Sequence, residues 1–135
     1  MRLSTRSRYG TRMMVDLAQR YDDGPVQIRE IAKRQDISAK YLEQLIIPLK
    51  KANYVKSVRG PKGGHLLAMA PEEITVGEIV RTLENEISLV SCIDNPKICS
   101  KTDTCPTRDV WKTATNAIYN ELNTVTLSEL IKRKK

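Results

Sequence analysis

The three cysteines of the chain, Cys92, Cys99 and Cys105, lie in one polar stretch with the spacing C-x6-C-x5-C. This spacing differs from the C-x2-C pair that is typical of zinc fingers. Thiolates favour an iron–sulfur cluster, copper(I) or zinc, and each of these takes about four ligands. The alternative is three thiols that are inert or merely oxidisable. A fourth ligand would come from Asp94, Asp103, Asp109, a water, a small thiol or a partner subunit.

The residues around these cysteines predict an irregular loop. Asp94-Asn95-Pro96 and Asp103 favour turns, and no apolar period runs through the stretch. The number of cysteines is odd, and the first residues lack the apolar core of a signal peptide. No run approaches the ~18 apolar residues of a membrane span. We therefore expect a cytoplasmic protein without a membrane partner, whose reduced thiols serve metal, cluster or redox chemistry.

The basic charge of the chain is confined to its first half. The formal net charge is +7. Residues 1–65 contain 14 Lys and Arg against 6 Asp and Glu, a net +8, whereas residues 66–135 contain 9 against 10, a net −1. A segment that faces a polyanion such as nucleic acid explains this division.

The periodicity of the first half predicts a winged helix-turn-helix. Apolar residues at helical spacing indicate helices over about 4–21, 27–34 and 38–53, with a tight turn at 35–38. A hairpin follows, with strands over 54–59 and 65–68 joined by a glycine-rich turn. Two short helices, a short turn and a basic hairpin together indicate a DNA-reading domain.

The start of the third helix is expected to carry the side chains that read bases. Lys40 can donate to guanine and Gln44 can pair with adenine, while Glu43 can accept from cytosine or reject a wrong base as a specificity modulator. Packing against the turn is the alternative role for Tyr41. Arg59 would enter a narrow minor groove or contact a phosphate. The predicted DNA-binding set is Ser38, Lys40, Tyr41, Gln44, Arg59 and Lys62.

The second half predicts a helix that pairs with another helix. Thr75 and Glu78 form a capping box that begins a helix ending near residue 84. A long helix over 106–123 carries one continuous apolar stripe, which we expect to form a dimer interface. A last short helix and a basic tail, 132–135, follow. The residues of the stripe are Val110, Trp111, Ala114, Ala117, Ile118 and Leu122.

The expected architecture is mainly α with a small β-hairpin. It comprises a winged helix-turn-helix domain over 1–84, a cysteine-rich sensor loop over 85–105, and a dimerisation helix with its tail over 106–135. An enzyme is not expected. The only histidine lies on the hairpin, and the chain has no nucleophile–base motif and no phosphate-binding loop pattern.

Four segments of the chain resemble IscR-type winged-helix regulators: MRLSTRSRYG, SAKYLEQLI, SVRGPKGGHLL and ITVGEIV. That family includes iron–sulfur assembly, nitric-oxide and cysteine-metabolism repressors. The resemblance implies a homodimer joined by the long helix and DNA reading by Lys40, Tyr41, Gln44 and Arg59. It also implies an iron–sulfur cluster, [2Fe-2S] in preference to [4Fe-4S], on Cys92, Cys99 and Cys105.

The chain departs from this family at the expected fourth ligand. The iron–sulfur assembly regulators place a histidine three residues after the last cysteine, where this chain has Arg108. A related branch takes an acidic ligand from the first helix of the partner, where this chain has Arg8. The first interval between cysteines is also one residue longer than the family pattern. The fourth ligand is therefore unknown.

Two interpretations follow from these observations. The leading one is a homodimeric transcriptional regulator, a repressor, whose affinity for a double-stranded DNA operator is modulated by an iron–sulfur cluster on the three-cysteine loop. The alternative is a cluster-free regulator that is controlled by a cysteine-biosynthesis enzyme, by zinc or by thiol oxidation. Either would agree with a protein partner from cysteine or iron–sulfur metabolism.

Overall fold

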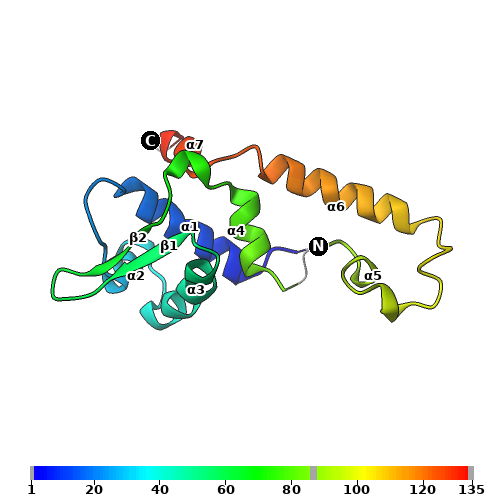
Figure 1. The fold of residues 1–135 in the computed structure, drawn as a ribbon, viewed down its shortest axis with the longest axis horizontal. Helices are drawn as coiled ribbons and strands as arrows, with labels where there is room; N and C mark the ends of the chain where they lie inside the picture. The colour runs from blue at the N-terminus through cyan, green and yellow to red at the C-terminus, as the bar shows by residue number, and fades with distance from the viewer. Residues whose placement is uncertain (1, 86–87, 134–135) are drawn as a thin grey trace.

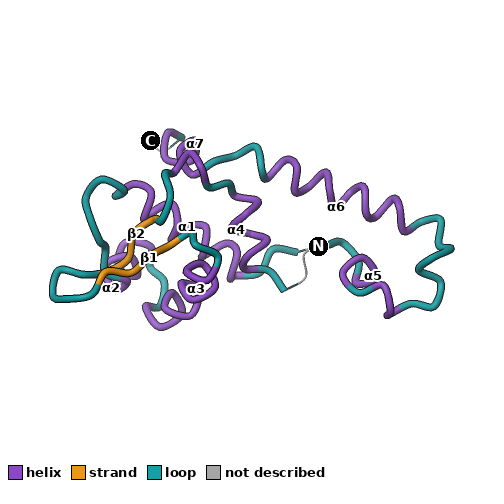
Figure 2. The backbone as a smooth tube through the Cα atoms, in the orientation of Figure 1, coloured by secondary structure: helices purple, strands orange, loops and turns teal. Residues whose placement is uncertain are grey.

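The fold is mainly helical with a small antiparallel hairpin, as the sequence predicts (Figures 1 and 2). The structure is a computed structural model that describes residues 2–85 and 88–133. Its longer helices are α1 (Thr5–Gln19), α2 (Ile28–Gln35), α3 (Ala39–Lys51), α4 (Val76–Leu83), α6 (Arg108–Leu122) and α7 (Leu127–Lys132). The shorter elements are strands β1 (Val55–Val58) and β2 (Gly64–Leu67), the single turn α5 (Ser91–Asp94), and the 3₁₀ turns η1 (Pro71–Glu73) and η2 (Pro96–Ile98).

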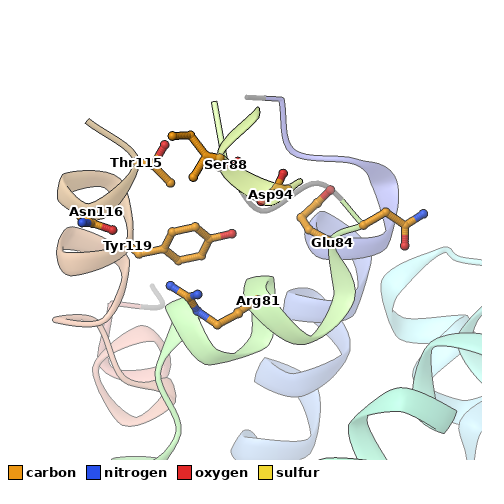
Figure 3. A pocket seen from close by; sticks show the side chains of 9 residues that line it. Arg81, Glu84, Ser88, Asp94, Thr115, Asn116 and Tyr119 are labelled. Carbon is orange, nitrogen blue, oxygen red and sulfur yellow. The ribbon is translucent and has the colours of Figure 1, made fainter. Parts of the chain in front are cut away.

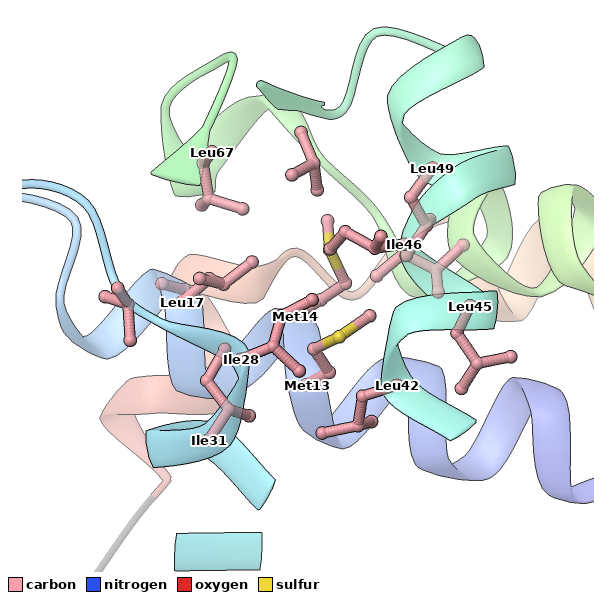
Figure 4. Packing of buried hydrophobic residues seen from close by; sticks show 14 of the residues in the cluster. Met13, Met14, Leu17, Ile28, Ile31, Leu42, Leu45, Ile46, Leu49 and Leu67 are labelled. Atoms are coloured by element: carbon pink, nitrogen blue, oxygen red, sulfur yellow. The ribbon is translucent and has the colours of Figure 1, made fainter. Parts of the chain in front are cut away.

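Helix α1 lies at the centre of the N-terminal body. Its side chains Met13, Met14 and Leu17 are almost completely buried, and they pack among residues of α2, α3 and β2 (Figure 4). Burying these side chains removes them from water, which favours the association of the elements. The core contains no phenylalanine, in agreement with the composition of the chain.

A buried carboxylate on α1 fixes the position of α2. Asp16 is fully buried, and Arg34 donates to it from Nε at 3.0 Å and from Nη2 at 2.7 Å. Gln35 Nε2 donates to the same carboxylate at 3.1 Å. Burial by itself would raise the pKa of Asp16, but the hydrogen bonds from Arg34 and Gln35 and the charge of Arg20 hold that pKa below its usual range. The ionised carboxylate therefore ties α1 to the end of α2.

The turn between α2 and α3 begins immediately after Arg34 and Gln35. Asp36 ends α2 in the left-handed conformation, with φ of 55°. The Ser38 hydroxyl then caps α3 by accepting from the Tyr41 N–H at 3.3 Å. Helix α3 buries one face through Leu42, Leu45, Ile46 and Leu49. The opposite face is left to solvent.

The hairpin is held beside α2 by a backbone bridge. Its strands pair with Val55 opposite Leu67 and Val58 opposite Gly64. Val26 and His65 exchange two N–H···O bonds of 2.8 Å, which join the hairpin to the segment before α2. A Cβ atom on Gly64 would lie 2.5 Å from the carbonyl oxygen of Val26, so only glycine permits this approach.

The C-terminal half extends away from this body (Figure 1). Helix α4 begins with the predicted capping box of Thr75 and Glu78. The cysteine loop lies at the end of the molecule opposite the hairpin, and helix α6 runs from that end back toward the body. Helix α7 returns to the body, where Leu127 is fully buried. Residues 134–135 of the predicted basic tail lie outside the described residues. Within the described ranges, no helix has the length and hydropathy needed to span a membrane.

Candidate DNA-binding surface and cysteine loop

The solvent face of α3 carries three of the predicted base-reading residues. Lys40, Glu43 and Gln44 are exposed, and Lys40 lies one helical turn before the other two. All three are on the side opposite the buried leucines. Ser38 is also exposed, although its hydroxyl is already used as the helix cap. The fold thus brings these four residues to one surface, where a groove of DNA could reach them.

Tyr41 has a structural contact that the sequence did not reveal. Its ring packs edge-on against Tyr9, with centroids 6.0 Å apart and planes at 87°. Its hydroxyl lies 2.9 Å from Thr5 Oγ1. These contacts are made with α1 and not with the turn, which was the packing alternative considered for Tyr41. Tyr41 is half-buried and joins the start of α1 to the reading helix.

An exposed apolar residue on the same face is absent from the predicted set. Ile47 has 52% of its surface exposed and lies one turn beyond Glu43 and Gln44. Because Ile47 follows Gln44 by three positions and Glu43 by four, helical spacing alone places it on the same face. An apolar side chain on a reading face can contact the methyl group of thymine.

The hairpin presents the predicted charges beside this face. Arg59 and Lys62 are both exposed. The tip is closed by a 2.9 Å bond from the Gly63 N–H to the Gly60 carbonyl, and a Cβ on Gly63 would collide with the backbone of Val58. A groove of about 690 Å³ separates the hairpin from α2 and α3, and it includes Arg29, Glu43 and His65. The hairpin has the position and the charge of a wing.

The three cysteines occupy one segment but do not converge. Cys92 is half-buried on α5, Cys99 is exposed after η2, and Cys105 is half-buried before α6. In the part of the chain that the structure describes, no three His, Cys, Asp or Glu side chains are placed to hold a metal ion. The candidate ligands are thus near one another in sequence without forming a closed site.

The environment of Cys105 nevertheless favours a thiolate. Its Sγ lies 3.2 Å from Thr107 Oγ1. The Thr107 hydroxyl lowers the pKa of Cys105, and the backbone N–H groups of Thr107 and Arg108 and the charge of Arg108 lower it further. The Lys101 N–H also donates to Cys99 Sγ at 3.4 Å. The donor chemistry of the loop therefore fits a thiolate-bound metal or cluster, although Arg108 cannot be its fourth ligand.

Helix α6 has one buried face and one face that is open to solvent. Thr115 and Tyr119 are buried on the side of α6 that packs against α4 and α5 of the same chain. The predicted stripe remains open: Val110 is 56% exposed and Trp111 is 41% exposed, Ala117 is exposed, and the other three members are half-buried. A shallow groove of about 490 Å³ runs along this face. Side chains of the groove come from Asp109, Val110, Thr113, Ala114 and Ala117.

A polar pocket lies between α4, α5 and α6 and was not predicted (Figure 3). The Arg81 guanidinium stacks over the ring of Tyr119, 4.2 Å from its centroid. Glu84, at the end of α4, borders the same pocket and accepts hydrogen bonds from Ser4 and Ser7 of the α1 start. No periodicity connects these segments, which explains why sequence patterns did not indicate the pocket.

A reading helix with a basic wing beside it defines a winged helix-turn-helix DNA-binding protein, and comparison with known proteins identifies its family. The family model Rrf2, described as "Iron-dependent Transcriptional regulator", matches residues 3–133. The chain belongs to the Rrf2 family of transcriptional regulators and is not an enzyme. The predicted fold class and the resemblance to IscR-type regulators are confirmed.

Individual relatives agree with this assignment. The chain is 46% identical over 132 residues to Protein rrf2 of Nitratidesulfovibrio vulgaris, covering 98% of this chain and 88% of the relative. The structure of T. potens IscR has a TM-score of 0.78 at 39% identity, covering 98% of this chain and 87% of that one. The structure of CymR, the global cysteine regulator of B. subtilis, has a TM-score of 0.81 at 35% identity, covering 100% and 99%.

The contact between Cys105 and Thr107 leads to a prediction about thiol reactivity. In a chain in which Cys92 and Cys99 are replaced by Ala, Thr107→Val should raise the pKa of Cys105, because the hydroxyl that stabilises the thiolate is lost. The rate of iodoacetamide alkylation should then reach its midpoint at a higher pH. Thr104→Val, in the same loop, is the matched control. Equal midpoints for the two variants would contradict the proposed stabilisation.

Proposed function

We propose that this chain is a homodimeric, DNA-binding transcriptional repressor whose affinity for its operator is modulated through the thiolates of Cys92, Cys99 and Cys105. The observation that supports this best is the open face of α3, where Lys40, Glu43 and Gln44 stand beside the basic wing. The charge division of the chain agrees with it, because the excess of basic residues belongs entirely to this half.

Each part of the surface has a distinct role in this proposal. Lys40 and Gln44 contact base edges in the major groove, and Glu43 selects against wrong bases. Ser38 at the helix start and Lys62 in the wing contact phosphates, while Arg59 reaches the minor groove or its phosphates. Tyr41 contacts DNA only at its exposed edge, since its hydroxyl and ring are already engaged with α1.

The dimer is proposed to form through the open stripe of α6. Large exposed side chains such as Val110 and Trp111 are unfavourable in water, and a second copy of the same stripe would bury them. A dimer also presents two reading helices, which suits two half-sites about one helical turn apart. The angle between the two α6 helices would then determine whether both reading helices fit their DNA half-sites at the same time.

The proposed cofactor is an iron–sulfur cluster held by the three cysteines, [2Fe-2S] in preference to [4Fe-4S], with its fourth ligand unknown. When bound, such a cluster would supply redox chemistry and join the thiolates that hold it. The chain itself keeps Cys105 ready as a thiolate through Thr107 and Arg108. Cys105 precedes α6 by only a few residues. Ordering the loop by binding a cluster would therefore also change the start of the dimer helix.

A cluster-free regulator is the second candidate. The similarity to CymR supports it, because the full length of this chain aligns with that cysteine regulator. Under this alternative, a protein from cysteine metabolism, zinc or oxidation of the exposed Cys99 would act in place of the cluster.

Spectroscopy of anaerobic protein separates the two candidates. Reconstitution with iron and sulfide should give a coloured protein with visible absorption and bound iron and sulfide, and its DNA affinity should differ from that of the colourless form. Cys105→Ser should lose the colour, whereas Ser100→Ala in the same loop should retain it. Colourless wild-type protein that carries zinc or no metal would favour the cluster-free regulator.

DNA specificity provides a second test. An operator selected from random DNA by the wild-type protein should be bound less selectively by Gln44→Ala, with a loss of about 1–3 kcal/mol at one base pair. Arg59→Ala should weaken binding to all sequences and reduce the slope of log K against log salt by about 0.9. If Gln44→Ala lost affinity equally for operator and random DNA, its role in reading bases would be wrong.

The dimer is tested by a charge placed inside the stripe. Wild-type protein in light scattering should have twice the 15.3 kDa mass of one chain. Ala114→Arg should reduce that mass towards a monomer, because each copy would bury an unpaired charge. Asn120→Arg, at an exposed position of α6 outside the stripe, should leave the mass unchanged. A dimer that survives Ala114→Arg would place the interface elsewhere.

A further inference from the structure

The pocket between α4, α5 and α6 has the size and the polarity of a small-molecule site (Figure 3). Its volume is about 540 Å³, within the range of roughly 300–1,000 Å³ that is usual for ligand pockets. The wall includes charged groups from α4 and α5 and polar groups from α6. Helices α5 and α6, which line it together with α4, lie on the opposite side of α4 from α3 (Figure 1).

A buried hydroxyl in this pocket lacks a hydrogen-bond partner. Tyr119 is only 3% exposed, and among the described residues nothing pairs with its hydroxyl. In Figure 3 the hydroxyl is directed into the pocket, towards the side where Glu84 and Asp94 lie. Buried polar groups are nearly always hydrogen-bonded. The hydroxyl is therefore available to a ligand that enters the pocket.

The charges around this hydroxyl are arranged in two groups. Arg81 stacks over the Tyr119 ring and makes no ion pair with a carboxylate in the described part of the chain. Glu84 uses Oε2 to accept from Ser4 and Ser7, while its Oε1 accepts no hydrogen bond from a described residue. Asp94 adds a second, exposed carboxylate. The pocket thus has one free guanidinium and two carboxylates with free oxygens.

The ionisation of Glu84 and Tyr119 is consistent with ligand binding at neutral pH. Burial by itself would raise the pKa of Glu84, but hydrogen bonds from Ser7 and Ser4 and the charge of Arg6 lower it overall, so Glu84 is ionised. Burial raises the pKa of Tyr119, and its hydroxyl therefore remains protonated and able to donate.

We propose that this pocket binds a small zwitterion of the amino-acid class. The ligand ammonium would lie between Glu84 and Asp94, and its carboxylate would accept from Arg81 and from the Tyr119 hydroxyl. A simple anion would be repelled by the two carboxylates, and a simple cation would leave the guanidinium of Arg81 unpaired and repel it. A molecule with both charges satisfies all of these groups.

Occupancy of the pocket would reach the DNA-reading surface through α1. Glu84 accepts from the Ser4 N–H and the Ser4 hydroxyl, both at 3.0 Å, at the start of α1. One residue further, Thr5 Oγ1 lies 2.9 Å from the hydroxyl of Tyr41 on the reading helix. This second step rests on the proposed DNA-binding function, and it makes the zwitterion an effector of operator affinity. The binding site itself does not depend on it.

Calorimetry on the reduced, full-length protein without DNA tests the site. The twenty standard L-amino acids are titrated one at a time, with ethylamine and propionate as probes that carry only one of the two charges. We expect at least one amino acid to bind, and neither single-charge probe to match it. Tyr119→Phe, which removes only the hydroxyl, and Arg81→Gln should each weaken that binding at least tenfold. Tyr54→Phe, whose hydroxyl bonds Glu78 outside the pocket, should leave it unchanged.

Three results would overturn the site: no binding by any amino acid, equal binding by Tyr119→Phe, or binding of ethylamine or propionate as tight as that of the amino acid. Operator affinity is then measured with and without the bound amino acid. An unchanged affinity would overturn the effector role while the site stands. Failure of the protein to bind any operator would refute the proposed function without altering the calorimetry.

Discussion

The fully buried carboxylate of Asp16 constrains how the first helices of the chain are arranged. An ionised carboxylate is tolerated in a core only when charged or polar donors surround it. Arg34 and Gln35, at the end of α2, supply those donors. The requirement fixes where α2 ends relative to α1, and with it the turn from which α3 begins. The apolar core alone could be satisfied by several small shifts of these helices, because hydrophobic contacts have little directionality.

Helix α1 is held in this way at both of its ends. Near its C-terminal end, Asp16 binds α2, and at its start, Ser4 and Ser7 bind Glu84 of α4. Between them, Gly10 packs so closely on Leu83 that no Cβ fits without displacing that side chain. Helix α3 and the pocket residue Glu84 therefore contact the same helix. Helix α4 also contacts α3 directly, whereas the cysteine loop lies at the far end of the molecule, next to the start of α6.

Local patterns predicted the six longer helices and the hairpin because each depended on neighbours in the chain. They did not predict the single turns η1, α5 and η2, and the last two interrupt the stretch expected to be an irregular loop. The Ser38 cap, the Thr75–Glu78 capping box and the glycine turn of the wing are interactions within a few residues, so they can be read from the sequence. Helix α6 begins at Arg108, two residues later than the expected start at Pro106, with Thr107 in the capping position. The roles of the predicted site residues on α3, the wing and the loop remain proposals.

The sequence by itself determined the class of this protein: the charge division, the helix-turn-helix spacing, the basic hairpin and the apolar stripe of α6 all follow from the order of residues. The tertiary structure alone decided which distant groups meet. It packed Tyr41 of α3 against α1, and it stacked Arg81 of α4 on Tyr119 of α6. It did not bring the three cysteines together into a metal site. The physical reason is that periodicity reports which face of a helix is buried, but contacts between helices depend on how their side chains pack together.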